Sequence, residues 1–91
     1  MPREIELYRT LQGKMPFKEW FESLKDVEAR AQIHKRLARI RLGLLGDHKS
    51  LGEDLYELRI NLGPGYRIYF SQIGKTIILL LAAIKAHSLQ T

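Results

Sequence analysis

Cysteine is absent from the 91 residues of the chain. This absence excludes a disulfide framework, a thiolate metal site and a cysteine nucleophile, and it fits a reducing compartment. Long apolar runs are missing too: the longest covers eight residues, from Ile77 to Ile84, which is too short to span a bilayer. The first residues form a charged stretch in place of an apolar signal segment, so we expect a cytoplasmic protein with no membrane partner.

Several catalytic motifs are also missing. The sequence has no phosphate-binding glycine loop, no serine-nucleophile motif and no metal-spaced cluster of histidines and carboxylates. His34, His48 and His87 are isolated from one another, a pattern that does not favour a metal site. We therefore predict neither a metal nor a cofactor.

Positive charge exceeds negative charge. Fifteen Lys and Arg against ten Asp and Glu give a formal charge of +5 and an isoelectric point near 9.7. Such an excess in a small domain is typical of proteins that bind a polyanion, most often nucleic acid. A basic protein without such a partner fits the composition equally well.

The chain lacks repeats, linkers and low-complexity tracts, so we expect a single domain over residues 1–91. Alternating polar and apolar residues predict a strand over residues 4–8. Apolar residues at helical spacing predict a first helix that begins near Pro16, and a second that follows the N-cap Asp26 and ends near Gly43. Two successive helices with a short connection form an αα-hairpin.

The remaining sequence has the patterns of strands. Residues 55–60 and 66–70 alternate on either side of a turn at 61–65. Residues 76–83 are continuously apolar, which is typical of a central strand buried on both faces. The order β-α-α-β-β-β predicts an α+β domain, with the N-terminal strand and the αα-hairpin packed on an antiparallel sheet.

Two arginines are expected to face each other across the hairpin. If Ile60 pairs with Tyr66, Arg59 lies directly opposite Arg67 on the face away from the core. Tyr69 shares that face. Like charges directly opposed across a strand pair destabilise it. An anion held between the two guanidinium groups is the simplest compensation, because arginine matches phosphate geometry.

Other arrangements of these charges stay open. The two arginines can extend into solvent, or Glu57 can neutralise one of them. Lys49 and His48 belong to an expected loop before the hairpin and are near enough to reach the arginines. The basic side of the second helix, with Arg36 and Arg39, is either a solvated face or an RNA-binding surface.

The second half of the sequence resembles a known family. The resemblance is carried by Gly46–Ile60 with its E-L-R sequence, by Gly63–Phe70 with G-P-G-Y-R-I-Y-F, and by the run Gly74–Leu81. These segments are similar to the addiction module killer proteins of the RelE/ParE superfamily, close to HigB and phage-encoded toxins. The resemblance covers about residues 3 to 82.

The resemblance implies a RelE-like fold and a toxin of a type II toxin–antitoxin system. Such a toxin is a ribosome-dependent mRNA endoribonuclease: it enters the ribosomal A site, cleaves mRNA without a metal and inhibits translation. Its implied partners are mRNA in the ribosome and a cognate helix-turn-helix antitoxin.

The resemblance also implies roles for individual residues. Catalytic roles fall on Arg59, Arg67, Lys49 and, more weakly, Tyr69, which can also serve only to pack. Positive charge on the reacting phosphate and proton transfer are the tasks that this cleavage requires. We assign RNA binding to four further residues: His48, Arg36, Arg39 and Lys75.

The C-terminal segment, residues 82–91, departs from the family pattern. The family usually continues with a segment resembling Gly-Gly-Asp-Lys-Ser-Ser/Thr-Gln, which is absent here. Codons compatible with Ala83–Ser88 give Gly-Asp-Lys-Ser-Thr/Ser-Gln in a shifted frame, so we hypothesise a frameshift that inactivates this copy. Natural divergence of the segment is the alternative. Sequencing the gene tests the hypothesis, which fails if no alternative frame encodes the motif.

Two other functions remain open. A ParE-like toxin has the same fold but inhibits DNA gyrase and cleaves no RNA. A non-catalytic remnant that binds RNA or the antitoxin fits if the C-terminal segment is altered.

Overall fold

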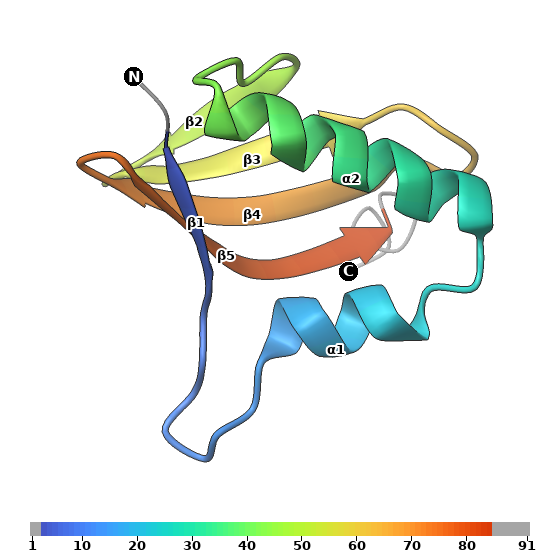
Figure 1. Cartoon of the computed structure of the whole chain (residues 1–91), viewed down its shortest axis with the longest axis horizontal. Coiled ribbons are helices and arrows are strands. Elements are labelled where there is room, and N and C mark those ends of the chain that lie inside the picture. The colour runs from blue at the N-terminus through green and yellow to red at the C-terminus, as the bar shows by residue number, and fades with distance from the viewer. Residues whose placement is uncertain (1–2, 85–91) are drawn as a thin grey trace.

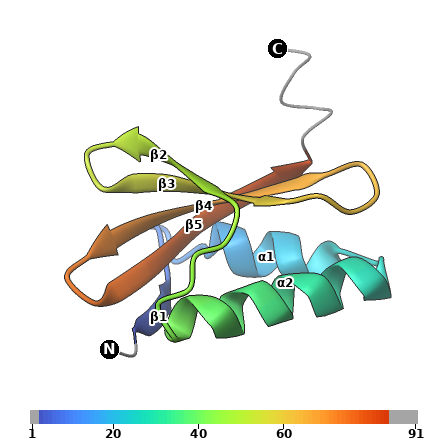
Figure 2. The same ribbon diagram turned by 90° about the horizontal axis from the view of Figure 1, so that it is seen from above.

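The computed structural model of the protein describes residues 3–84. Both helices cover one face of a five-stranded sheet with the order β1-β5-β4-β3-β2 (Figures 1 and 2). The expected α+β class is therefore confirmed. No helix in this part of the chain is long and apolar enough to cross a membrane. The elements are β1 (Glu4–Leu7), α1 (Pro16–Ser23), α2 (Val27–Arg41), β2 (His48–Gly52), β3 (Leu55–Ile60), β4 (Tyr66–Ile73) and β5 (Thr76–Ile84).

Both helices begin and end at residues suited to those positions. Helix α1 begins at Pro16, whose missing N–H costs nothing in a first turn. At the start of α2, Oδ1 of Asp26 accepts a hydrogen bond of 3.1 Å from the N–H of Ala29. After α2, Gly43 adopts a left-handed conformation with φ 85° and donates to the carbonyl of Ile40 at 2.8 Å. The expected N-cap and glycine stop are confirmed.

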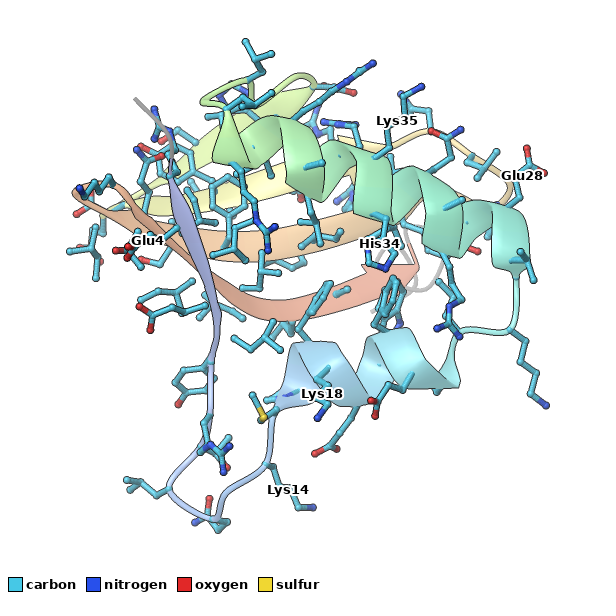
Figure 3. The ribbon with its side chains drawn as sticks, in the orientation of Figure 1. Glu4, Lys14, Lys18, Glu28, His34 and Lys35 are labelled. Carbon is cyan, nitrogen blue, oxygen red and sulfur yellow. The ribbon has the colours of Figure 1, made fainter. Side chains whose placement is uncertain are left out.

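The core lies between the two helices and the covered face of the sheet. On this face the ring of Tyr56 stacks on Phe70, with ring centroids 5.3 Å apart. His34 points from α2 toward α1 and meets the ring of Phe21 edge-on at 5.3 Å (Figure 3), although the residue as a whole is exposed. The buried apolar residues are Phe17, Ala29, Ile33, Ile40, Leu58, Ile60, Tyr66, Ile68, Phe70, Ile77 and Leu79.

Strand β2 was not expected, because its residues were assigned to a loop. It pairs antiparallel with β3 at the edge of the sheet, and every one of its residues is exposed. An edge strand without a buried face has no apolar alternation to reveal it. The connecting residues Glu53 and Asp54 both have positive φ, at 52° and 63°. Two-residue hairpin turns of this conformation usually carry Asn-Gly, so the sequence gives little sign of this one.

Two expectations, one about β1 and one about β5, are wrong. The sheet is mixed, because β1 pairs parallel with β5. Strand β5 is an interior strand, but the helices cover only one of its faces. Ile77 and Leu79 are buried on that face, while Ile78 is half-buried and Leu81 is 46% exposed. The continuous apolar run therefore belongs to a strand with one covered face, not to a fully buried strand. The register between β4 and β5 shifts at a β-bulge between Tyr69 and Phe70.

The cap of α2 gives a test of the helical layer. Replacing Asp26 with Ala removes the acceptor for the N–H of Ala29 and should lower the free energy of unfolding by about 1 kcal/mol. Urea denaturation followed by circular dichroism measures the change. The matched control is Glu28→Ala, since Glu28 also lies in the first turn but caps no N–H of the described residues. Equal losses in both variants would contradict the cap assignment.

Candidate anion-binding site

The uncovered face of the sheet carries the expected pair of arginines. Ile60 pairs with Tyr66, and Arg59 lies directly opposite Arg67 across β3 and β4. Both apolar residues are buried under the helices, so strand alternation directs the two arginines to the other face. The predicted register of this hairpin is confirmed.

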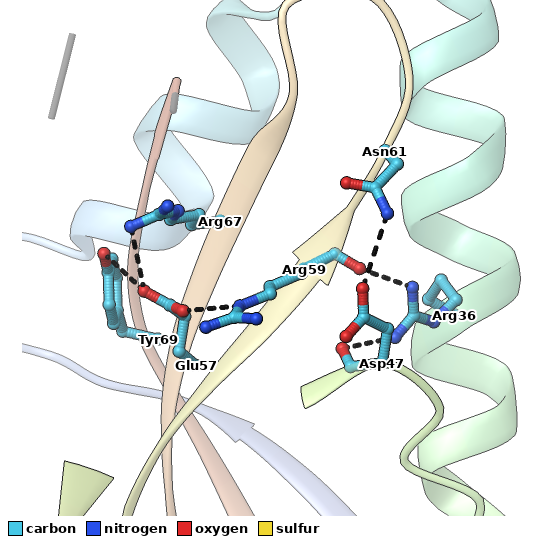
Figure 4. A network of polar contacts seen from close by, with 7 residues as sticks. All are labelled: Arg36, Asp47, Glu57, Arg59, Asn61, Arg67 and Tyr69. Carbon is cyan, nitrogen blue, oxygen red and sulfur yellow. Dashed lines mark hydrogen bonds and ion pairs between the residues drawn. The ribbon is translucent and has the colours of Figure 1, made fainter. Parts of the chain in front are cut away.

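Glu57 lies between the two guanidinium groups and contacts both (Figure 4). Nε of Arg59 donates to Oε1 of Glu57 at 2.9 Å, and Nη1 of Arg67 donates to Oε2 at 3.3 Å. The hydroxyl of Tyr69 donates to the same Oε2 at 3.2 Å. Glu57 is only 5% exposed, although no helix covers this face. One carboxylate therefore compensates both arginines, where the sequence suggested at most one.

The environment of Glu57 favours its charged form. Burial raises the pKa of this carboxyl, but the hydrogen bond from Arg59, the charge of Arg67 and the hydrogen bond from Tyr69 outweigh burial. The pKa of Glu57 is therefore held below its ordinary value of 4.5. In return, the hydrogen bond to Glu57 raises the pKa of Arg59. The site holds an ionised carboxylate and two permanent cations at neutral pH.

A polar pocket of about 250 Å³ opens beside the arginines. Arg59 and Arg67 retain donors for it after binding Glu57. Nη2 of Arg67 forms no hydrogen bond with the described residues, and the side chain is 21% exposed, whereas its Nε is buried and has no partner among them. Within residues 3–84, the Nη groups of Arg59 form no hydrogen bond, and its side chain is 39% exposed. The pocket is lined by Asp47, Arg59, Ile60, Asn61, Gly65, Tyr66 and Arg67.

Arg36 holds the backbone of this site from the helix layer. Its Nη1 donates to the carbonyl of Arg59 at 2.7 Å, and its Nη2 donates to the carbonyls of Leu45 and Asp47, each at 3.1 Å. Burial lowers the pKa of Arg36, while the charge of Asp47 raises it. Any Cβ at position 46 would lie 3.0 Å from Nη2 of Arg36, so Gly46 leaves room for this arginine. These three hydrogen bonds tie α2 to the backbone of β3 and of the loop before β2. The RNA-binding role expected for Arg36 stays a prediction.

Four of the other predicted site residues do not line the pocket. Lys49 is exposed and pairs in register with Glu57, so it shares the face of the arginines without lining the pocket. His48, its neighbour in β2, alternates to the other face, and its Nδ1 lies 2.8 Å from the carbonyl of Gly46. Residue Arg39 is exposed on α2, in the helix layer.

Lys75 lies in the turn at the opposite end of β4 from Arg67. The six residue steps of β4 from Arg67 to Ile73 already span about 20 Å. The structure therefore does not bring Lys75 into the same site. The roles predicted for Lys49, His48, Arg39 and Lys75 in RNA binding or catalysis stay predictions.

Three residues of the site were missed as site residues by sequence reasoning. Glu57 could have been found, because it precedes Arg59 by two positions on one strand face and lies opposite Tyr69 in the expected register. Asp47 and Asn61 join the site through the loops beside β3, where Nδ2 of Asn61 donates to Oδ2 of Asp47 at 3.4 Å. No sequence pattern indicates their meeting.

The site can bind and stabilise an anion, but its described residues offer little for proton transfer. The two arginines stay protonated in proteins. Tyr69 directs its proton to Glu57, whose lowered pKa makes it a weak base. Among residues 3–84, no group of three or more histidine, cysteine or acidic side chains could hold a metal ion. Lys85 and His87, in the atypical C-terminal segment, lie outside the described residues.

The fold and the site define a small α+β protein with a polar pocket beside two paired arginines. Over 73 residues the chain is 40% identical to a protein of Haemophilus influenzae described as an uncharacterized protein; the match spans 79% of this chain and 74% of the relative. The chain therefore belongs to the same family as that Haemophilus protein. No family model matches the sequence, and no solved structure matches it.

Removing the carboxylate of Glu57 should destabilise the protein in a pH-dependent way. The Glu57→Ala change leaves two opposed, partly buried guanidinium groups without their anion, at an expected cost of about 2–3 kcal/mol at pH 7. The pKa of Glu57 is lower in the folded than in the unfolded protein, so its contribution is complete above pH 4.5 and is lost as the pH falls through the folded value.

Urea denaturation of both proteins between pH 3 and about pH 7 measures this dependence. The matched control is Glu22→Ala, which removes the same charge from an exposed position of α1. The stability difference between the wild type and the Glu57 variant should shrink toward acid pH, whereas the control should show little change. A difference that grows as the pH falls would contradict the assigned pKa direction.

Proposed function

We propose that the protein is a RelE-like toxin of a type II toxin–antitoxin system. In this proposal it is an mRNA endoribonuclease of the cytoplasm that acts on the ribosome and is held inactive by a helix-turn-helix antitoxin. The sequence resemblance of residues 46–81 to the addiction module killer proteins supports the assignment. The α+β architecture, with two successive helices on one face of the sheet, is compatible with a RelE-like fold.

The observation that carries the proposal is the meeting of Arg59 and Arg67 at the mouth of a polar pocket. Both arginines retain guanidinium donors that no described residue occupies. Metal-independent cleavage of RNA proceeds by attack of a 2′-hydroxyl on the adjacent phosphate. Preorganised positive donors stabilise the negative charge that develops on the phosphate in such a reaction. The pocket therefore suits an RNA phosphodiester.

A second candidate function, a non-catalytic RNA-binding protein, is favoured by a specific observation. The described residues of the pocket supply charge and hydrogen-bond donors but no group poised for proton transfer near neutral pH. General acid–base catalysis needs a group whose pKa lies near the operating pH. An altered C-terminal segment would leave such a protein able to bind RNA phosphate but slow to cleave it.

The decisive experiment compares the chain as it stands with a version whose last residues are restored to the family-like sequence. Each protein is added to translating ribosomes, and mRNA cleavage is mapped by primer extension. We expect Arg67→Ala in the active version to reduce cleavage by about 100- to 1,000-fold, because one preorganised donor to the reacting phosphate is lost. Lys18→Ala, which removes an equal charge from exposed α1, should leave cleavage unchanged.

The other outcomes separate the alternatives. Ribosome binding without cleavage by either version would favour the non-catalytic RNA-binding protein. Absence of ribosome binding, together with inhibition of DNA supercoiling by gyrase, would favour a ParE-like toxin and overturn the proposal.

A further inference from the structure

A buried carboxylate, that of Glu57, contacts both arginines of the pocket from behind the pocket lining. Arg59 and Arg67 bring two positive charges, and Glu57 cancels one of them at contacts of 2.9 and 3.3 Å. Asp47 also lines the pocket, and its charge raises the pKa of both Arg59 and Arg36. The charges of Arg36, Arg59 and Arg67 against those of Glu57 and Asp47 leave a net charge of +1 on these five groups.

We infer that Glu57 makes this pocket prefer a singly charged phosphate, as in an internal phosphodiester, over the doubly charged phosphate of a chain end. The inference rests on the proposed function, because it assumes that the pocket receives a phosphate group. Within that function, Glu57 determines specificity: it selects sites inside an RNA chain over terminal phosphates and free phosphate.

The geometry separates the donors that bind Glu57 from those that remain for a ligand. Glu57 takes Nε of Arg59 and Nη1 of Arg67. Nη2 of Arg67 and the Nη groups of Arg59 are left without partners among the described residues. A phosphate that binds these remaining donors lies next to an anion that is 5% exposed and thus weakly screened by water. The arginines balance the first negative charge of the ligand. A second negative charge on the ligand is repelled by the carboxylate of Glu57.

The other groups around Glu57 do not change this balance. The hydroxyl of Tyr69, on β4, is neutral and donates to the carboxylate. Lys49, across from Glu57 on β2, carries a positive charge, but its side chain is exposed and does not line the pocket. Lys49 is therefore suited to attracting a polyanion from solution, with little effect on the charge preference inside the pocket.

The two ligand charges can be compared with small probes. Dimethyl phosphate carries one negative charge at any pH of interest, whereas monomethyl phosphate gains a second charge near pH 6. Glu57 stays ionised at pH 5, because its pKa lies below 4.5. A change from pH 5 to pH 8 therefore alters the charge of monomethyl phosphate. Dimethyl phosphate keeps its charge, so a change in its binding reports an effect of pH on the protein itself.

The experiment titrates the full chain with each probe and follows the Nε–Hε signals of Arg59 and Arg67 by NMR. At pH 8 we expect dimethyl phosphate to bind about tenfold more tightly than monomethyl phosphate, and at pH 5 we expect the two to bind alike. In Glu57→Gln, which keeps the shape but removes the charge, the doubly charged probe should bind more tightly. The control Glu22→Gln has the same net charge as that variant and should keep the wild-type preference.

Tighter binding of monomethyl phosphate by the wild type at pH 8 would overturn the inference. An equal loss of preference in Glu22→Gln would do the same, because the effect would then come from net charge. If Glu57→Gln fails to fold, the wild-type comparison at pH 5 and pH 8 still decides the question. Absence of mRNA cleavage on ribosomes would count against the proposed function alone, because the probes measure binding without cleavage.

Discussion

The carboxylate of Glu57 compensates two positive charges that the hairpin itself brings together. Ile60 and Tyr66 must pair with their side chains toward the helices, and a strand period of two then places Arg59 directly opposite Arg67. The register that buries the apolar side chains on the covered face is thus the same register that brings the two arginines together on the other face. A one-residue slip that separated the arginines would also turn the apolar side chains of β3 into solvent. Glu57 offsets the repulsion between the two arginines that this register imposes.

The same carboxylate also preorganises the site. Each arginine is anchored to Glu57 through one nitrogen, so its remaining donors are held in place before a ligand arrives. Arg36 adds a second support from the helix layer by binding the carbonyls of Arg59 and Asp47. Donors fixed in this way lose little conformational freedom on binding, which is the condition under which electrostatic stabilisation is most effective.

The part of the site that sequence reasoning predicted is the part that strand alternation controls. The opposition of Arg59 and Arg67 followed from two alternating segments and the loop between them. Strand β2 was missed because its exposed residues lack a pattern and its turn uses Glu53 and Asp54. The parallel pairing of β1 was missed because alternation shows which face of a strand is buried and not which strand lies beside it. The carbonyl contacts of Arg36 depend on the path of a loop, which no spacing specifies.

In the proposed function, phosphate binding and RNA cleavage depend on different parts of the chain. Under the proposed function, the paired arginines that line the pocket supply the charge and the hydrogen-bond donors that a phosphodiester needs. Cleavage by attack of a 2′-hydroxyl additionally needs a proton acceptor, and the contacts that make Glu57 a good anchor make it a poor base. Under the same proposal, a change confined to the C-terminal segment can remove catalysis while the fold and the arginine pocket persist. Under the proposed function, loss of toxicity need not entail loss of RNA binding.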